Sequence, residues 1–187
     1  MNARFLRTRD HNPYRNLARE EALLHLLNEA SEDATLFVWQ NTKTVVIGRN
    51  QNAWLECDVS ALGRDGVYLA RRTTGGGAVY HDDGNLNFSF LLPRDQYDLN
   101  RQLGVIQSAV KSFGIDCAFS GRNDLVVGDQ KFSGNAFRFT RHGALHHGTL
   151  MISVKPEMLS RYLRVSKEKL AARGVFHAIY DLLRDDV

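Results

Sequence analysis

A glycine-rich segment follows two arginines at residues 71–80, which read RRTTGGGAVY. Three glycines in succession, Gly75–Gly77, cost backbone entropy and give no side-chain packing, so they suit a backbone that approaches a ligand and turns its N–H groups toward an anion. Arg71 and Arg72 can add forked donors for phosphate or carboxylate. The segment lacks the Gly-Lys-Ser/Thr of a P-loop and the spacing of a dinucleotide-binding fingerprint. It therefore predicts an anion site of another kind, with a flexible hairpin loop as the alternative.

A polar pattern follows in residues 81–90, HDDGNLNFSF. Asn85, Asn87 and Ser89 alternate with apolar residues, and this period of two places the three polar side chains on one face of a strand. If that face borders a cleft, the amides can bind a ligand. The alternative is a solvent-exposed strand face.

Asp124 and Lys131 flank a Gly-Asp pair at 128–129, in the segments SGRNDLVV and KFSG. A hairpin that turns at this pair would bring the carboxylate and the ammonium group to one site. Lysine is a compact cation that can bind an acyl carbonyl and an α-phosphate together, and aspartate can hold Mg²⁺ or an ammonium group. The alternative is a surface ion pair.

Two histidines, His146 and His147, are adjacent in the segment HHGT. Neighbouring residues on a strand point to opposite faces, so the two imidazoles cannot readily chelate one metal ion. We expect one of them to face the cleft and the other to face the core or the solvent. The pattern itself leaves open which is which.

Strands and helices of mixed order surround these motifs. Patterns of β-branched and aromatic residues predict strands at 3–8, 35–40, 44–49, 67–72, 78–81, 86–92, 125–127, 131–132 and 145–154, with Asn41 at the turn between the second and third. Apolar spacing and start signals predict helices from Asn12-Pro13 to about 29, at 58–63, at 100–113, and from 156 to the end with a break at Gly174. Because these elements lack a regular βαβ rhythm, we expect an α+β fold with a mixed β-sheet.

Composition narrows the class of protein. The 187 residues are 43% hydrophobic and 24% charged, and we expect one domain over residues 1–187. The net charge of +3 is spread along the chain, which argues against a nucleic-acid partner. Two scattered cysteines, Cys57 and Cys117, lack zinc-site spacing and suit a reducing cytosol. Since no apolar run is long enough to span a bilayer, we expect a cytoplasmic protein without a membrane role.

The order and content of these motifs together resemble those of the lipoate–protein ligase A family. The resemblance rests on RRTTGGGAVYHDDGNLNFSF, SGRNDLVV, KFSGNAFR and HHGTL, and on the flanking segments PYRNLAREEALL, TVVIGRNQNAWLEC and KEKLAARGV. It covers nearly the whole chain and is highly specific. It implies the fold of the biotin/lipoate protein ligase catalytic domain, a mixed sheet flanked by helices. We expect this domain alone, without the small accessory C-terminal domain of many such ligases.

The resemblance also implies a two-step reaction. Lipoate reacts with ATP and Mg²⁺ to give lipoyl-AMP and pyrophosphate, and the lipoyl group then passes to a lysine of an acceptor domain. The implied acceptors are the E2 component of 2-oxoacid dehydrogenases and the H protein of glycine cleavage, and a separate subunit carrying the C-terminal domain is a further implied partner. Because ATP activates the carboxylate, the enzyme needs no nucleophile and must instead hold two anions together.

Roles for individual residues follow from the same resemblance. Lys131 is the implied catalytic residue and contacts both the lipoate carboxyl group and the α-phosphate. The implied site for ATP and lipoyl-AMP comprises Arg72, Gly75, Gly76, Gly77, Ala78, Val79, Tyr80, Asn85, Asp124, Lys131 and His147. The implied lipoate contacts are Arg72, Val79, His81 and Lys131. Asp124 is the candidate Mg²⁺ ligand, and we expect an apolar slot for the dithiolane tail at Val45, Val79 and Phe88.

Two other functions are compatible with the sequence. A lipoyl or octanoyl transferase would take a pre-activated acyl group, and related octanoyltransferases carry that group on a cysteine. Cys117 is a candidate carrier, but no base stands beside it in the sequence. A truncated lipoate-binding subunit would need a partner for turnover. The intact segment around Lys131 favours the adenylate route.

Overall fold

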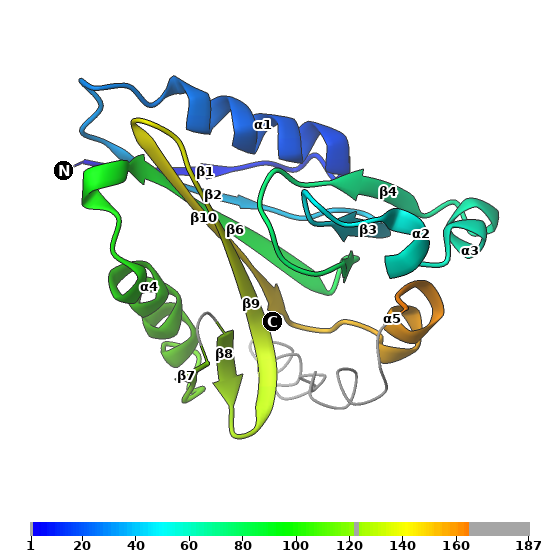
Figure 1. The fold of residues 1–187 in the computed structure, drawn as a ribbon. Coiled ribbons are helices and arrows are strands. Elements are labelled where there is room, and N and C mark those ends of the chain that lie inside the picture. The colour runs from blue at the N-terminus through cyan, green and yellow to red at the C-terminus, as the bar shows by residue number, and fades with distance from the viewer. Residues whose placement is uncertain (1, 122–123, 165–187) are drawn as a thin grey trace.

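The computed structural model describes residues 2–121 and 124–164, which form two sheets flanked by helices (Figure 1). Within these residues the larger sheet has the strand order β1-β2-β6-β10-β9-β8-β7, and the smaller sheet has the order β4-β3-β5. The strands are β1 Ala3–Arg7, β2 Ala34–Trp39, β3 Thr44–Ile47, β4 Tyr68–Arg71, β5 Val79–His81, β6 Asn85–Pro93, β7 Ala118–Ser120, β8 Asp124–Val127, β9 Gln130–Phe139 and β10 Gly143–Met151. The helices are α1 Pro13–Leu26, α2 Ala53–Glu56, α3 Val59–Arg64, α4 Leu99–Lys111 and α5 Pro156–Tyr162, with a short 3₁₀ helix at Arg94–Gln96.

Helices α1 and α4 cover opposite faces of the larger sheet (Figure 1). The sheet is mixed, because β1 runs parallel to β2, whereas the pairs β2–β6, β6–β10 and β10–β9 are antiparallel. Leu91 of β6 packs under α1 with Leu145, while Phe88 of β6 packs under α4 with Leu125 and Phe132. Residues 88 and 91 are three positions apart, so their side chains leave the strand on opposite faces. The α+β fold with a mixed sheet and flanking helices is therefore confirmed.

Helix α1 begins where the sequence predicts. The Asn12 side chain accepts hydrogen bonds from the backbone N–H groups of Tyr14 at 3.0 Å and Arg15 at 3.2 Å, and proline occupies the first helical position. Its buried residues Asn16 and Glu20 are four apart and share one face. That face brings an amide and a carboxylate against the sheet.

The central strand of the smaller sheet is buried on both faces. All four residues of β3 are buried, which fits a strand whose two faces are both covered. β3 pairs in parallel with β4 and antiparallel with β5, while α3 packs against β4 and α5 packs against β5. Tyr80 of β5 lies 5.5 Å from Tyr162 of α5, measured between ring centroids. This packing fixes β5 and the loop that precedes it.

Several local predictions are corrected by the structure. β2 and β3 lie in different sheets, so Asn41 does not form a hairpin turn and is fully buried between the sheets. Helix α1 ends at Leu26 rather than near residue 29, and β9 continues to Phe139 instead of ending at 132. β7 and α2 were not predicted, because short elements carry too few residues for a period to show. The predicted helix beyond residue 164, with its break at Gly174, lies outside the described residues.

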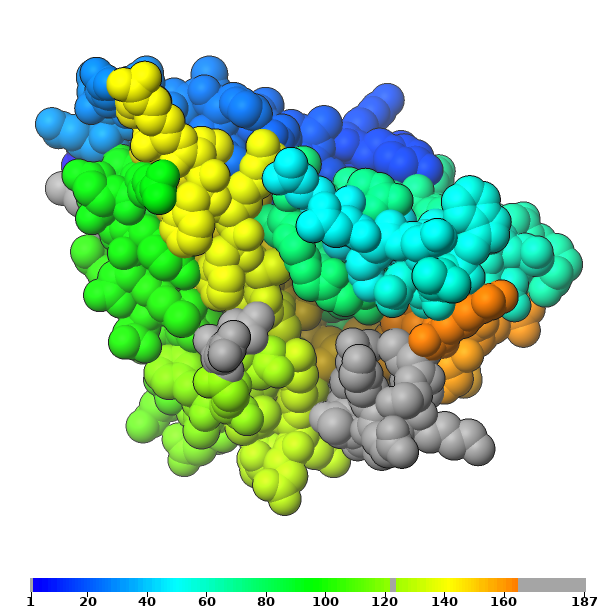
Figure 2. Space-filling model, viewed as in Figure 1, coloured from blue at the N-terminus to red at the C-terminus, as the bar shows by residue number. Residues whose placement is uncertain are grey.

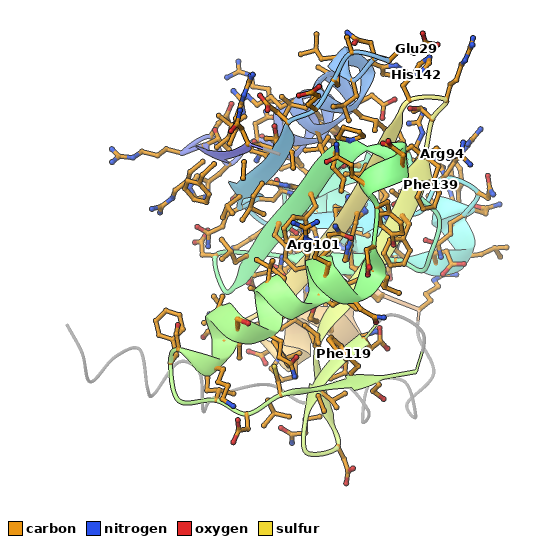
Figure 3. All side chains as sticks on the ribbon, turned by 90° about the vertical axis from the view of Figure 1, so that its left-hand side faces the viewer. Glu29, Arg94, Arg101, Phe119, Phe139 and His142 are labelled. Atoms are coloured by element: carbon orange, nitrogen blue, oxygen red, sulfur yellow. The ribbon has the colours of Figure 1, made fainter. Side chains whose placement is uncertain are left out.

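The turn between β9 and β10 is tied to neighbouring elements by side chains (Figure 3). The Arg94 guanidinium lies over the Phe139 ring, 5.7 Å from its centroid, and His142 Nε2 lies 3.9 Å from Glu29 Oε1. These contacts hold the two long strands at the end remote from the cavity described below. Among the described helices, none has the length and apolarity needed to cross a bilayer.

Candidate active site

A cavity of about 260 Å³ lies where β5 and the glycine-rich loop meet the strands β6, β10 and β9 of the larger sheet. Figure 2 shows β9, in yellow to lime, beside the cyan-to-green part of the chain on one face of the molecule. The predicted site residues that line the cavity are Arg72, Gly76, Gly77, Val79, Tyr80, His81, Asn85, Asp124, Lys131 and His147. Four separate motifs of the sequence thus meet around one space. Gly75 and Ala78 belong to the loop but are not among the lining residues.

Arg72 shapes the glycine-rich loop from within. Its Nη2 donates to the carbonyls of Gly75 at 2.7 Å and Gly77 at 2.8 Å, its Nε donates to Thr74 Oγ1 at 3.0 Å, and its Nη1 donates to the Val46 carbonyl at 3.3 Å. A planar fork with several donors suits this role, because it can bind carbonyls on several sides at once. The guanidinium therefore braces the loop as well as lining the cavity.

The loop also depends on the absence of side chains at two glycines. Gly76 has a φ of 92°, in the region that favours glycine, and a Cβ there would lie 2.8 Å from Arg72 Nη2. A Cβ at Gly48, just after β3, would lie 2.2 Å from the Gly76 carbonyl oxygen. The loop and the end of β3 are thus in close backbone contact.

Burial lowers the pKa of Arg72 to about 10, with nearby Glu20 acting in the opposite direction, so the guanidinium stays charged at neutral pH.

Lys131 and Asp124 form an ion pair, with 2.7 Å between Nζ and Oδ1 and each side chain about one-third exposed. The hairpin that joins them turns at Gly128, whose φ is 56°, as predicted. Lys131 and Gly134 both line the cavity, although residues three apart on a regular strand face opposite ways. The register between β8 and β9 shifts between Lys131 and Ser133, which is a β-bulge. Because of this extra residue, Gly134 lies on the same side of β9 as Lys131, while Phe132 packs in the core.

The polar face of β6 is buried and borders the cavity. Asn85, Asn87 and Ser89 are each 2% exposed or less, and the first two line the cavity. Asn85 Nδ2 donates to Asn87 Oδ1 at 3.1 Å, and Asn87 Nδ2 donates to the Trp39 carbonyl at 3.3 Å. Ser89 accepts from Trp39 Nε1 at 3.0 Å and donates to Glu20 of α1. The predicted strand face is therefore a wall of the cavity and not an exposed surface.

The adjacent histidines point to opposite faces of β10. His147 lines the cavity, and its Nδ1 lies 2.8 Å from Glu20 Oε1 while its Nε2 lies 2.9 Å from Thr74 Oγ1. His146 is fully buried on the other face, with its Nε2 2.9 Å from Asn135 Oδ1 and its ring 4.7 Å from that of Phe137. Burial lowers the pKa of His146 to about 3, with a smaller contribution from His147. The structure thus places His147 at the cavity.

Apolar side chains line part of the cavity, but only one of the three predicted ones is among them. Val79 lines it, whereas Val45 lies in the core of the smaller sheet and Phe88 lies under α4. Val46 lines the cavity in place of Val45, because successive residues of a strand face opposite ways. Trp39 also lines it. Other lining residues that the sequence did not single out are Leu17, Gly134, Ala136, Met151 and Leu159. No local pattern marks them, because they come from four separate elements, α1, β9, β10 and α5.

Neither cysteine is at the cavity within the part of the chain that the structure describes. Cys57 is fully buried and its thiol donates to the Ala53 carbonyl at 3.0 Å, and Cys117 packs under α4. Burial raises the pKa of both thiols. A raised thiol pKa disfavours the thiolate that an acyl carrier needs.

Asp124 is the one acidic lining residue among the described positions, and these positions contain no group of three or more His, Cys, Asp or Glu side chains that could hold a metal ion. In many sites Mg²⁺ is bound by only one or two carboxylates, with phosphates and waters as the other ligands. Asp124 is therefore the described lining residue that could contribute a carboxylate to such a site.

The chain matches known families and proteins over most of its length. The family described as lipoyl protein ligase A/B catalytic domain matches residues 12–178. Lipoate-protein ligase A of Psychrobacter cryohalolentis is 47% identical over 94% of this chain and 51% of its own length. Lipoate-protein ligase A of Bdellovibrio bacteriovorus is 47% identical over 87% of this chain and 49% of its own length. The chain thus spans about half the length of these curated relatives.

Several solved structures have the same fold as this chain. A lipoate-protein ligase A bound with ATP has a TM-score of 0.83 and 28% identity, covering 99% of this chain and 82% of that one. The bi-partite lipoate protein ligase of Thermoplasma acidophilum, studied with its E2 lipoyl domain, has a TM-score of 0.84 and 28% identity over 99% of this chain and 80% of that one. P. falciparum LipL1 in complex with lipoate has a TM-score of 0.81 and 32% identity over 100% of this chain and 64% of that one. With a family match that extends over residues 12–178, the chain belongs to the lipoyl protein ligase A/B catalytic domain family.

Proposed function

We propose that this chain binds lipoate and ATP in the cavity, forms lipoyl-AMP and pyrophosphate, and transfers the lipoyl group to a lysine of an acceptor domain. One observation carries the proposal: a single cavity joins the glycine-rich loop, the ion-paired Lys131 and an apolar wall. Lipoate needs the apolar wall for its tail, and the adenylate needs cations and backbone N–H groups. The solved relatives bound with ATP and with lipoate support this assignment.

Both half-reactions need positive charge at the same site. Before the reaction, a carboxylate must approach a triphosphate that repels it, and Lys131 can reduce this repulsion by leaving Asp124 for the two anions. During transfer, charge develops on the acyl carbonyl, and the same ammonium group can stabilise it. In the first half-reaction, Asp124 would be free of Lys131 and would be the residue to hold Mg²⁺, an ion that would neutralise charge at the phosphates. One lysine can therefore serve in both steps without a covalent enzyme intermediate.

The acceptors we propose are the E2 lipoyl domain of 2-oxoacid dehydrogenases and the H protein of glycine cleavage. The Thermoplasma acidophilum ligase described with its E2 lipoyl domain supports the first of these. The free thiols of Cys57 and Cys117 suit the reducing cytoplasm in which we expect the reaction to take place.

The test is to incubate the purified chain with lipoate, ATP, Mg²⁺ and a lipoyl acceptor domain, and to measure the mass of the acceptor. A parallel reaction receives synthetic lipoyl-AMP in place of lipoate and ATP. The matched control is an acceptor whose target lysine is replaced by arginine. Modification from ATP and lipoate is the expected result. No modification from either donor, beside an active reference ligase, would overturn the catalytic proposal.

A second candidate is the catalytic part of a two-part ligase. It rests on the likeness to the bi-partite Thermoplasma acidophilum ligase and on the match to half of the curated relatives. In this case the chain alone would transfer the lipoyl group from lipoyl-AMP but would not form it from ATP. Adding the separately expressed C-terminal part of a relative would then restore adenylation. Modification by the chain alone from ATP and lipoate would contradict this candidate.

A further inference from the structure

We propose that Asn41 is a positioning residue that holds His81 as a neutral imidazole with its proton on Nε2, and that His81 presents this N–H to the carboxyl oxygen of the acyl substrate. The inference rests on the proposed function, because it names an acyl carboxylate as the ligand. It assigns to His81 the role of a hydrogen-bond donor and excludes the role of a base at the cavity. A buried row of hydrogen-bonded side chains, Asn16, Asn41 and His81, leads from α1 to β5.

The first link is Asn16, whose amide orientation is fixed at both ends. Its Nδ2 donates to the carbonyl oxygens of Asp10 at 2.8 Å and Gln40 at 2.9 Å, which can only accept. Its Oδ1 accepts from Arg19 Nη1 at 3.0 Å, which can only donate. A flipped amide would lose all three hydrogen bonds. Asn16 is fully buried, so water would not replace them.

The second link transmits this orientation to Asn41. Asn16 Nδ2 lies 3.1 Å from Asn41 Oδ1, so this atom of Asn41 must be the oxygen. The other arm of the Asn41 amide is then Nδ2, and it lies 3.2 Å from His81 Nδ1. An amide nitrogen donates, so His81 Nδ1 must accept and carries no proton. A neutral His81 therefore bears its hydrogen on Nε2.

At the cavity, the Nε2 of His81 is a hydrogen-bond donor that no described residue uses. His81 lines the cavity and is 3% exposed. Among the described residues, no atom forms a hydrogen bond with His81 Nε2, although that atom is buried. A buried donor without a partner costs free energy, so its presence in a wall of the cavity indicates that a ligand completes it. Asn41 occupies the other nitrogen and is not a lining residue, so Nε2 is the nitrogen left for the ligand.

The surroundings of the His81 ring also favour its neutral form. Burial, followed by the nearby Arg72 and His147, lowers the pKa of His81 to about 3. The ring therefore stays neutral and cannot take a second proton at neutral pH. Asp124, the one acidic lining side chain in the described part of the chain, is paired with Lys131. An incoming carboxylate is thus a suitable acceptor for the His81 N–H, because it brings the negative charge that this wall lacks.

The chemical consequence concerns how the carboxylate is activated. A donor at the carboxyl group can orient one oxygen while the other attacks the α-phosphorus, and the same N–H can bind the carbonyl oxygen of the adenylate. No proton moves to or from His81 in this role. The residue keeps one protonation state through both half-reactions.

The direct test is nitrogen NMR of the full chain with ¹⁵N-labelled histidine, assigned by the His81→Gln variant. We expect the shift of an unprotonated Nδ1 and a protonated Nε2 for His81 from about pH 5 to 8, where an ordinary histidine titrates. A protonated Nδ1, or titration of the ring within this range, would overturn the proposal. This measurement uses the wild-type chain and does not depend on the folding of any Asn41 variant.

Lipoate alone, without ATP, is then titrated into the same sample. We expect the Nε2–H resonance of His81 to move as lipoate saturates the protein. If lipoate binds, as judged by other resonances, and the Nε2–H resonance stays in place, the donor role is wrong while the proposed function stands. If lipoate does not bind at all, the proposed function and the substrate contact both fail, and only the tautomer assignment survives.

Two near-isosteric variants distinguish the positioning of His81 by Asn41 from a general effect on the structure. Asn41→Leu removes the donor to Nδ1, so the proton of His81 can occupy either nitrogen. We expect KM for lipoate to rise about tenfold, the loss typical of one hydrogen bond to a charged group, with KM for ATP unchanged. The control is Thr44→Val. Thr44 pairs with His81 across β3 and β5, and the substitution removes a hydroxyl that donates to the Thr42 carbonyl. Equal changes in KM for lipoate in both variants, or a pure Nε2–H form in Asn41→Leu, would contradict the proposal.

Discussion

Lys131 Nζ lies 2.7 Å from Asp124 Oδ1 across the β8–β9 hairpin, at the wall of the cavity. Asp124 thus holds the ammonium group in place without substrate. In the proposed reaction, the ammonium group exchanges this carboxylate for the substrate anions. A partly exposed ion pair of this kind contributes little to stability, on the order of 1 kcal/mol or less. The pair is therefore better suited to positioning a cation than to holding the fold.

Replacing Lys131 by methionine should abolish most activity and preserve the fold. Without the ammonium group, neither the approach of the two anions nor the charge on the acyl carbonyl is stabilised, so we expect a loss of about 10²–10³-fold in each half-reaction. Pyrophosphate release and transfer from lipoyl-AMP measure the two steps separately. Lys111→Met is the control, because Lys111, the last residue of α4, forms an exposed ion pair with Asp116 and does not line the cavity. Activity within a few-fold of wild type in either step would show that Lys131 is not needed there.

Gly134→Ala should impair activity through Lys131 alone. A Cβ at residue 134 would lie 3.2 Å from both Cε and Nζ of Lys131, so the lysine must shift by a few tenths of an ångström. We expect kcat to fall about tenfold, because small misplacements of a reacting group are costly. The free energy of unfolding should change by less than about 1 kcal/mol.

The control for this variant is Gly104→Ala in α4, where an added Cβ meets nothing within 4 Å. It should raise the free energy of unfolding by about 0.5–1 kcal/mol through helix propensity and leave kcat unchanged. If Gly134→Ala keeps full activity, the close contact with Lys131 has no bearing on catalysis.

Arg72→Lys and Arg71→Lys should differ sharply although the substitution is the same. Arg72 uses three different nitrogens to bind the loop and Val46, and a single ammonium group cannot reach all of them. Arg71 uses one nitrogen, Nη1, for its bonds to the carbonyls of Gly48, Arg49 and Gln51. Lysine can replace a single nitrogen, so we expect little change there.

For Arg72→Lys we expect a loss of about 1–3 kcal/mol in the free energy of unfolding and a rise in KM for ATP, because the buried loop carbonyls lose their donors. Denaturant unfolding and steady-state kinetics measure the two effects. Equal behaviour of both variants would mean that the forked geometry of Arg72 does not hold the loop.

Stability should fall as the pH decreases from about 6.5, before the carboxylates titrate. The folded-state pKa values of His81 and His146 are lowered to about 3, whereas the unfolded value is the ordinary 6.5. Below pH 6.5 the unfolded chain therefore binds more protons, and each histidine lowers the free energy of unfolding by up to about 1.4 kcal/mol per pH unit. The carboxylates with lowered pKa values, Asp10, Glu21 and Asp65, act only at lower pH.

Denaturant unfolding between about pH 4.5 and 7.5 measures this slope. His146→Phe removes one of the two titrating rings from an aromatic environment and should reduce the slope by about half. His11→Asn, at a half-exposed position, should leave it unchanged. A stability that does not change from pH 7.5 to 4.5 would contradict the neutral, buried state of both rings.

Local patterns in the sequence predict most of the longer elements and the residue types that meet at the cavity. The cap at Asn12, the alternation from Asn85 to Ser89 and the turn at Gly128 are local patterns, because each depends on neighbours within a few positions. The motif residues were also recognisable as a set. These local patterns predict the structure correctly because the tertiary fold keeps the local conformations that they favour.

Which of these residues face the cavity cannot be predicted from local patterns and follows from the tertiary packing. The β-bulge beyond Lys131 reverses the facing of Gly134, and a one-residue difference places Val46 rather than Val45 at the wall. The buried chain from Asn16 through Asn41 to His81 links residues 25 and 40 positions apart, and no sequence period records such contacts. Facing and pairing depend on how the two sheets pack against each other and α1, and that packing is fixed by the whole core and not by any one segment.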